Sequence, residues 1–243
     1  MILLLGGTTE AKQVAKALDD AGANYIYSSR TKVAFEGKGQ YRYGSLDKED
    51  LKEFCISHQI SSIIDACHPF ATELHSTVAS LSDQLPLIRF EREFSEQVIN
   101  PLVKYVNDYD DALTLIKANG YQSMLALTGV QSIPKLNSYW HTHTSWFRIL
   151  NRDYSVDFAA HYQFPAQNLL FGLPQDKEEE IQLFNTLKPE VIITKESGLN
   201  GKLDAKIQAA IACNIPILII KKPELPVSFK IVHNLKELLN MIQ

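Results

Sequence analysis

The sequence predicts an α/β protein built as two Rossmann-like lobes, with mainly parallel sheets and a cleft between the lobes. Short apolar runs alternate with helical patterns along the chain, and this alternation is typical of parallel sheets. The first apolar run ends at Gly6-Gly7 and leads straight into a helical pattern, as in nucleotide-binding folds. Periodicity is lost over Phe94–Pro101, and we place the boundary between the lobes at the start of this stretch.

The first lobe is predicted to span residues 1–93 and to bind a dinucleotide. Asp47 supplies a capping carboxylate, and Glu49 and Asp50 follow in the first turn, which favours a helix start at this point. The expected strands are Ile2–Leu5, Tyr25–Ser28, Ile63–Asp65 and Leu87–Phe90, and the expected helices run from Thr8 or Thr9 to Ala21, from Asp47 to His58 and from Phe70 to Ser82.

The second lobe is predicted to span residues 94–243 and to form the substrate side. Ligands of parallel sheets collect at the carboxyl ends of the strands, so both lobes are expected to present functional residues there, toward the cleft. The expected strands are Val103–Val106, Met124–Leu127, Thr144–Ile149, Leu169–Phe171, Val191–Thr194 and Ile217–Ile220, and the expected helices are Tyr109–Asn119, one starting at Ser132, Lys177–Leu187 and Leu203–Cys213.

The composition is that of an ordinary globular protein, with 45% hydrophobic and 21% charged residues in a chain of 243. A net charge of −4 argues against a nucleic-acid groove, because phosphate binding needs clustered excess positive charge. The three cysteines are far apart, which indicates neither a disulfide framework nor structural zinc and favours a reducing cytoplasm. No apolar run approaches a membrane-spanning length, so a soluble protein is expected.

The Gly6-Gly7 turn is the first candidate binding element. Glycines allow a tight turn and a close approach of a diphosphate, and the N–H groups at the start of the next helix would face the phosphates. The full Gly-x-Gly-x-x-Gly pattern is absent, since Ala11 stands at its last position. An ordinary turn between a strand and a helix remains the alternative.

The end of the second strand carries Ser28, Ser29, Arg30 and Thr31. An acidic residue at this point would bind the ribose hydroxyls of NAD, whereas these side chains offer hydroxyls and one fixed positive charge. We therefore favour NADPH over NADH, because arginine can form charge-assisted hydrogen bonds with a ribose phosphate. A solvated turn without a binding role is the alternative interpretation of this segment.

At the end of the third strand, Asp65 and His68 lie in the stretch Asp-Ala-Cys-His-Pro. An imidazole here could donate a hydrogen bond or a proton near neutral pH beside the cofactor. Positioning of cofactor or substrate is favoured over acid catalysis, and a purely structural histidine is the alternative.

In the second lobe, Thr128 and Gly129 follow one strand, and Lys195, Glu196 and Ser197 follow another. A lysine before Ser-Gly and a helix resembles an anion-binding loop, although such a lysine is often merely solvated. Further cations for a polycarboxylate are Arg89, Arg92, Arg148 and Arg152, each of which could instead be a surface ion-pair partner. The sequence lacks the Tyr-x-x-x-Lys pair, the Gly-x-Ser-x-Gly elbow and a Walker lysine, which argues against a short-chain dehydrogenase, a hydrolase and a P-loop protein. The spacing of the histidines does not favour a metal site either.

Taken together and in order, several motifs resemble the precorrin-6A reductase family of cobalamin biosynthesis. The resemblance covers nearly the whole chain. It is carried by Leu4-Leu-Gly-Gly-Thr-Thr-Glu-Ala11, Ser29-Arg-Thr31, Asp65-Ala-Cys-His-Pro-Phe-Ala71, Arg89-Phe-Glu-Arg92, Leu127-Thr-Gly-Val-Gln131 and Thr194-Lys-Glu-Ser-Gly198.

The resemblance implies a two-lobed reductase, monomeric or loosely associated, that transfers a hydride from NADPH or NADH to a double bond of a tetrapyrrole. It leaves open whether the ring carries cobalt, and it requires no protein-bound metal. The competing hypothesis is a non-catalytic NADP-binding sensor or scaffold. Under the reductase hypothesis, the diphosphate and adjoining ribose of the cofactor contact Gly6, Gly7, Thr8 and Glu10. The adenosine side contacts Ser29, Arg30 and Thr31, and His68 lies at the nicotinamide. The substrate contacts Thr128, Gly129, Lys195 and Ser197, and the candidate catalytic residues are His68 and Lys195.

Overall fold

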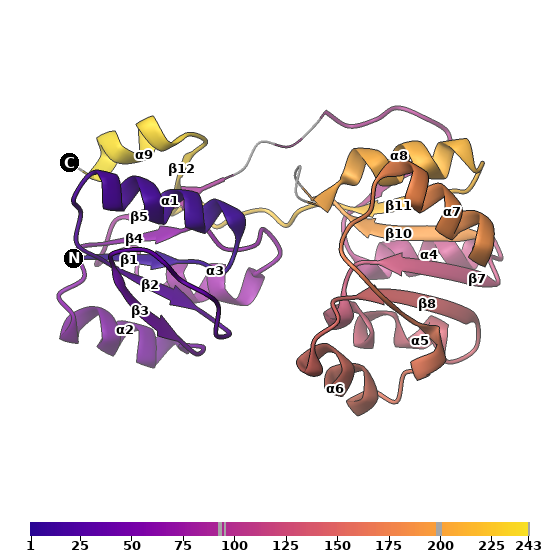
Figure 1. Cartoon of the computed structure of the whole chain (residues 1–243), viewed down its shortest axis with the longest axis horizontal. Coiled ribbons are helices and arrows are strands. Elements are labelled where there is room, and N and C mark those ends of the chain that lie inside the picture. Colours follow the sequence, from indigo (N-terminus) through magenta and orange to yellow (C-terminus); the bar gives the residue numbers. More distant parts are fainter. Residues whose placement is uncertain (92–93, 95, 198–200, 243) are drawn as a thin grey trace. The chain divides into compact units, whose positions relative to one another are not determined.

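The computed structural model describes residues 1–91, 94, 96–197 and 201–242, and the chain divides into two compact units (Figure 1). Unit 1 combines residues 1–93 with residues 223–243, and unit 2 comprises residues 94–222. Each unit is built on a six-stranded sheet. All strand pairs of the described residues are parallel, which confirms the predicted α/β class.

In unit 1 the strand order is β12-β5-β4-β1-β2-β3, so the first strand lies inside the sheet. The chain moves outward from β1 in one direction and then returns to its other side, as in doubly wound folds. The strands are β1 (Ile2–Leu5), β2 (Tyr25–Ser29), β3 (Gln40–Tyr43), β4 (Ser62–Asp65), β5 (Leu87–Phe90) and β12 (Lys230–Val232), and the helices are α1 (Thr9–Asp20), α2 (Lys48–Ser57), α3 (Thr72–Ala79) and α9 (Leu235–Ile242).

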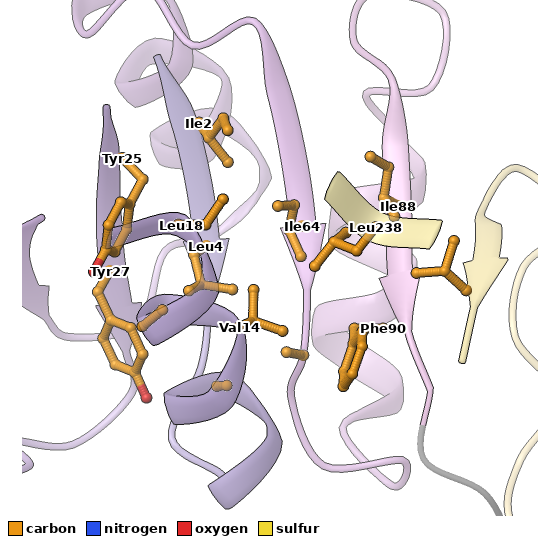
Figure 2. Close-up of a cluster of buried hydrophobic side chains, with 14 residues drawn as sticks. Ile2, Leu4, Val14, Leu18, Tyr25, Tyr27, Ile64, Ile88, Phe90 and Leu238 are labelled. Carbon is orange, nitrogen blue, oxygen red and sulfur yellow. The ribbon is translucent and has the colours of Figure 1, made fainter. Parts of the chain in front are cut away.

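Helices cover both faces of the unit 1 sheet, and alternate residues of each strand therefore enter different cores. On one face, Leu4 and Ile64 pack with Val14 and Leu18 of α1 and with Leu238 of α9 (Figure 2). The other core lies under α2 and α3 and contains Leu3, Leu5, Ile26, Ile63, Leu51, Cys55 and Val78. These buried runs explain why the sequence pattern located β1, β2 and β4.

The C-terminal segment differs from the sequence prediction, which assigned residues 223–243 to the second lobe. In the structure these residues belong to unit 1. Strand β12 pairs with β5, with Ile231 opposite Arg89, and α9 packs against α1. The local sequence pattern could not reveal that β12 pairs with β5, because β12 is only three residues long and β5 lies far away in the sequence.

In unit 2 the strand order is β6-β11-β10-β7-β8-β9. The described helical elements also include three 3₁₀ turns, labelled η1 (Val130–Ser132), η2 (Pro134–Leu136) and η3 (Ala166–Asn168). The strands are β6 (Val103–Val106), β7 (Ser123–Leu127), β8 (Thr144–Ile149), β9 (Leu169–Phe171), β10 (Val191–Lys195) and β11 (Ile217–Ile220), and the α-helices are α4 (Tyr109–Ala118), α5 (Asn137–Trp140), α6 (Asp153–His161), α7 (Lys177–Leu187) and α8 (Leu203–Ala212).

The helix expected from Ser132 is instead two 3₁₀ turns followed by the single turn of α5. Pro134 lacks the N–H that a continuous helix would bond to the carbonyl four residues earlier, so the segment proceeds in short turns. In the part of the chain that the structure describes, no helix is both long and apolar enough to cross a membrane.

Candidate functional site

The turn from β1 to α1 forms the centre of the carboxyl edge in unit 1. Thr8 caps α1, because its Oγ1 accepts the Ala11 N–H at 3.1 Å. Gly7 has φ +108°, a conformation that favours glycine, and a Cβ added there would meet nothing within 4 Å. Glu10 lies in the first turn of the helix and is partly buried. The open face at Gly7 therefore adjoins a helix N-terminus, where the dipole favours an anion.

Gly6 makes room for a buried aromatic ring beneath the turn. Its N–H donates to the Ser28 carbonyl at 2.8 Å, and the Gly7 N–H donates to the Tyr27 hydroxyl at 2.9 Å. A Cβ on Gly6 would lie 2.5 Å from Cζ of Tyr27, so the missing side chain makes room for this buried ring. Tyr27, which sequence reasoning missed, thus shapes the turn that the glycines form.

The loop after β4 carries His68 and is tied to the first turn. The Thr8 hydroxyl donates to the Ala66 carbonyl at 2.7 Å, and the Cys67 thiol lies 3.5 Å from the Gly6 carbonyl oxygen. His68 is exposed, and its Nδ1 accepts the Phe70 N–H at 3.2 Å. The neutral ring therefore carries its proton on Nε2, which is a hydrogen-bond donor at this edge of the sheet.

A buried cluster of charged side chains holds the backbone of Cys67, the residue just before His68. Asp65 Oδ1 accepts the Cys67 N–H at 2.9 Å, and Arg89 Nη2 donates to the Cys67 carbonyl at 2.9 Å. Arg89 also pairs with Asp65, at 3.0 Å, and with Glu91, at 3.5 Å. The backbone N–H and the backbone carbonyl of Cys67 are thus both held by charged side chains that are almost completely buried.

His75 completes this cluster from α3, with Nε2 3.3 Å from Asp65 Oδ2. Burial lowers the pKa of His75, and this effect exceeds the opposing effect of the Asp65 carboxylate. Sequence reasoning identified Asp65 and Arg89 as separate residues but not their contact. Because Arg89 is paired inside the protein, it is not one of the free cations that were expected to bind a polycarboxylate.

The corner formed by the ends of β2 and β3 holds the residues expected at the adenosine side. Ser29 is buried, and its hydroxyl donates to the Thr31 carbonyl at 2.8 Å and lies 3.1 Å from the Tyr41 hydroxyl. Arg30 and Thr31 are exposed beyond the strand. Ser29 therefore shapes the corner internally, while Arg30 and Thr31 face solvent. Sequence reasoning missed β3 and with it Arg42, whose Nη1 donates to Ser28 Oγ at 2.6 Å.

Two surface depressions in unit 1 lie at the other edge of the sheet, near the amino ends of the strands. One is lined by residues 82–87 with Ser228 and Lys230, and the other by α2, by Gln59 and Ile60 just after it, and by the segment that follows α3. Neither includes the polar residues of the strand ends. The candidate site therefore rests on the backbone geometry and side-chain chemistry of the carboxyl edge.

In unit 2, the turn after β7 is held together by two hydroxyl groups. Thr128 Oγ1 and Ser132 Oγ are 2.5 Å apart, and Ser132 Oγ donates to the Gly129 carbonyl at 2.6 Å. Gly129 has φ +80°, in the region that favours glycine. Thr128 is buried, so its hydroxyl stabilises the turn through Ser132.

Lys195 ends β10, next to β7, and lies within electrostatic reach of Lys135. Burial, followed by the positive charge of Lys135, lowers the pKa of Lys195 to about 8. Ser197 follows in the next loop and packs against Gly201, where any Cβ would collide with the serine side chain. Lys135, which sequence reasoning missed, thus gives this edge a second cation.

The remaining arginines that were considered as cations for a polycarboxylate differ in whether their charge is already paired. Arg148 is buried and forms hydrogen bonds of 2.9 and 2.7 Å with the two carboxylate oxygens of Glu180. Its charge is therefore compensated within unit 2. Arg152 is exposed where α6 begins, and Arg92 lies outside the described residues.

Comparison with known proteins adds the following similarities. A family model described as precorrin-6x reductase CbiJ/CobK matches residues 1–243. The chain is 26% identical over 240 residues to a cobalt-precorrin-6A reductase of Methanocaldococcus jannaschii, with 94% of this chain and 93% of the relative covered. It is 30% identical over 232 residues to a precorrin-6A reductase of Rhodococcus erythropolis, covering 93% and 90%. A solved structure of CobK precorrin-6A reductase superposes with a TM-score of 0.79 at 21% identity, covering 99% of this chain and 95% of that one.

Proposed function

The chain belongs to the precorrin-6x reductase family, and from this membership we propose that it reduces a double bond of a corrin precursor in cobalamin biosynthesis. The match along the full length of the chain carries the proposal. The reaction would convert precorrin-6A, or its cobalt complex, to the 6B form. Relatives of both kinds are named, one acting on the cobalt complex and one on precorrin-6A itself.

The proposed reductant is a nicotinamide dinucleotide bound by unit 1, with NADPH preferred to NADH. The carboxyl edge suits such a group, because the open face at Gly7 adjoins the N-terminus of α1 and exposed Arg30 lies at the end of β2. The diphosphate and its ribose are assigned to Gly6, Gly7, Thr8 and Glu10, and the adenosine side to Ser29, Arg30 and Thr31.

A reduced nicotinamide supplies the hydride when it is bound. His68 is assigned to its vicinity, where Nε2–H can hold a carbonyl or amide oxygen in a fixed orientation. Thr8 and the Asp65–Arg89 pair support this role, because they fix the two loops that meet at the site. A fixed orientation favours reaction, since it reduces the entropy lost on reaching the transition state.

The substrate side is assigned to Thr128, Gly129, Lys195 and Ser197 in unit 2. Corrin precursors carry several carboxylates, and the cations at Lys195 and Lys135 are suited to bind them. Thr128 and Gly129 shape the neighbouring turn. Lys195 would act through its charge, by holding the macrocycle.

The decisive experiment mixes the purified protein with NADPH or NADH and with precorrin-6A, with and without cobalt. Loss of the nicotinamide absorbance together with a change in the macrocycle spectrum would establish the reductase, its cofactor and its substrate. Binding of NADPH without turnover of either ring would favour the alternative of a non-catalytic sensor. A monomeric, cytoplasmic enzyme is part of the same proposal, and light scattering in solution tests the first of these properties.

A further inference from the structure

Arg42 of β3 is a partly buried cation whose hydrogen-bond partners among the described residues are neutral. Nη1 donates to the Ser28 hydroxyl at 2.6 Å and Nη2 donates to the Tyr43 carbonyl at 3.2 Å. The guanidinium carbon also lies 5.4 Å from the centre of the Phe54 ring. Burial lowers the pKa of Arg42, and within the described chain no carboxylate pairs with its charge.

The Arg42 guanidinium lies at the carboxyl edge of the sheet. Arg42 pairs in register with Ser28, and its other partner, Tyr43, ends the strand. A Cβ added to Gly44 would come within 3.4 Å of Nη2, so the turn after β3 passes close to the guanidinium. Figure 1 shows β3 beside β2 at one side of the sheet. The charge therefore lies at the same corner as the end of β2.

Arg30 supplies a second cation at this corner. It directly follows β2, is exposed, and its guanidinium makes no hydrogen bond or ion pair with another described residue. Thr31 adds an exposed residue with a hydroxyl. Two arginines without a counter-charge favour a dianionic ligand, because guanidinium groups bind phosphate oxygens in pairs of parallel hydrogen bonds.

We propose that Arg42 and Arg30 together bind the 2′-phosphate of NADPH, with Ser28 holding Arg42 in place. The end of the second strand is where a dinucleotide fold meets the adenosine ribose, and this phosphate is the group that distinguishes NADPH from NADH. The inference rests on the proposed function and adds to it a residue that determines cofactor specificity. Arg42 acts by direct contact, whereas Ser28 is a positioning residue.

Isothermal titration calorimetry of the full-length protein tests the proposal with four ligands: NADPH, NADH, 2′,5′-ADP and 5′-ADP. The variants are Arg42→Gln and Arg42→Lys. Lys16→Gln is the matched control, because Lys16 is an exposed cation of the same unit and pairs only with Asp20 among the described residues. Circular dichroism and thermal unfolding verify that each variant is folded.

Arg42→Gln is expected to weaken NADPH and 2′,5′-ADP about 10- to 100-fold, the range for loss of charged hydrogen bonds, and to change NADH and 5′-ADP less than about threefold. Arg42→Lys should fall between the parent and Arg42→Gln, and Lys16→Gln should match the parent. Equal weakening of NADPH and NADH by Arg42→Gln would show that Arg42 only maintains the fold and would overturn the proposal.

The parent protein separates this inference from the proposed function. If the parent binds NADPH and NADH with equal affinity, the phosphate site is overturned while a nicotinamide reductase remains supported. If it binds neither dinucleotide, the proposed cofactor is overturned together with the site. A preference for NADPH that Arg42→Gln abolishes would support both.

Discussion

The Thr8 hydroxyl and the Ala66 carbonyl oxygen are 2.7 Å apart, and this hydrogen bond joins the first turn of the chain to the loop that carries His68. The same hydroxyl accepts the Ala11 N–H and caps α1. One oxygen therefore fixes the start of a helix and the adjoining loop of β4. The proposed contacts to the diphosphate and to the nicotinamide depend on this single side chain.

Replacement of Thr8 by Val keeps the shape of the side chain and removes both hydrogen bonds. We expect Thr8→Val to lower the free energy of unfolding by about 2 kcal/mol, the sum of a lost cap and one further hydrogen bond. NADPH affinity should fall as well, as measured by calorimetry. Thr8→Ser keeps the oxygen and serves as the control, so equal losses in both variants would contradict this explanation.

Substitution of Gly6 by Ala tests the packing of Tyr27 on the turn. The new Cβ would lie 2.5 Å from Cζ and 2.6 Å from the hydroxyl of a fully buried ring, so the turn or the ring must move. We expect a loss of about 1–3 kcal/mol in stability, measured by urea unfolding, and weaker NADPH binding. Gly172→Ala is the control, because its nearest neighbour, Cδ of Arg148, is 4.0 Å away, and it should behave like the parent.

The buried cluster around Asp65 predicts a large effect of removing Arg89. Arg89→Met would remove the cation that pairs with the buried Asp65 carboxylate and should destabilise unit 1 by about 3–5 kcal/mol. Denaturant unfolding measures this loss. Lys16→Met removes one partner of the exposed Lys16–Asp20 pair and should leave the unfolding midpoint unchanged. A similar midpoint for both variants would refute a structural role for the buried cluster.

The lowered pKa of Lys195 predicts a pH dependence of substrate binding. With a pKa of about 8, the ammonium loses its charge as the pH rises through this value, so kcat/KM for the carboxylate-rich substrate should decline above it. Arginine stays charged in this range, so Lys195→Arg should remove the decline. An identical alkaline decline in parent and Lys195→Arg would assign it to another group, such as Lys206, whose pKa burial also lowers to about 8.

Stability should change in the opposite sense over the same range. The unfolded chain holds its Lys195 proton up to its ordinary pKa near 10.5, whereas the folded protein releases it near 8. The unfolded state therefore binds more protons between these values, and the free energy of unfolding should rise with pH there. Thermal unfolding of the parent and of Lys195→Met measures this contribution by difference.

Most strands of both sheets could be predicted because they are short, buried apolar runs between polar segments. β1 and β5 have the bounds that the pattern indicated, and β10 extends one residue further. The edge strand β3 was missed, since Gln40–Tyr43 contains no buried residue. Helix α6 was also missed, and its exposed apolar residues, including Tyr154 and Val156, explain its weak pattern.

The candidate site could be predicted only as a set of strand ends. Parallel sheets place functional residues there, and this rule located Gly7, His68 and Lys195. The contacts that shape the site join residues far apart in the sequence, as Tyr27 joins Gly7 and Arg89 joins Cys67. Such contacts depend on the register of the sheet, which a single sequence does not reveal. The roles of these residues in binding stay predictions.

The return of residues 223–243 to unit 1 determines the order in which the two units can be completed. Unit 2 is continuous, so its described strands have all been synthesised before β12 is made. Unit 1 must wait through the synthesis of 129 residues, 94–222, with β5 as an open edge on its sheet. An open strand edge invites incorrect pairing, and β12 can cover it only after the whole of unit 2 has been made. In the finished protein, unit 2 is an insertion whose two ends are both anchored in unit 1.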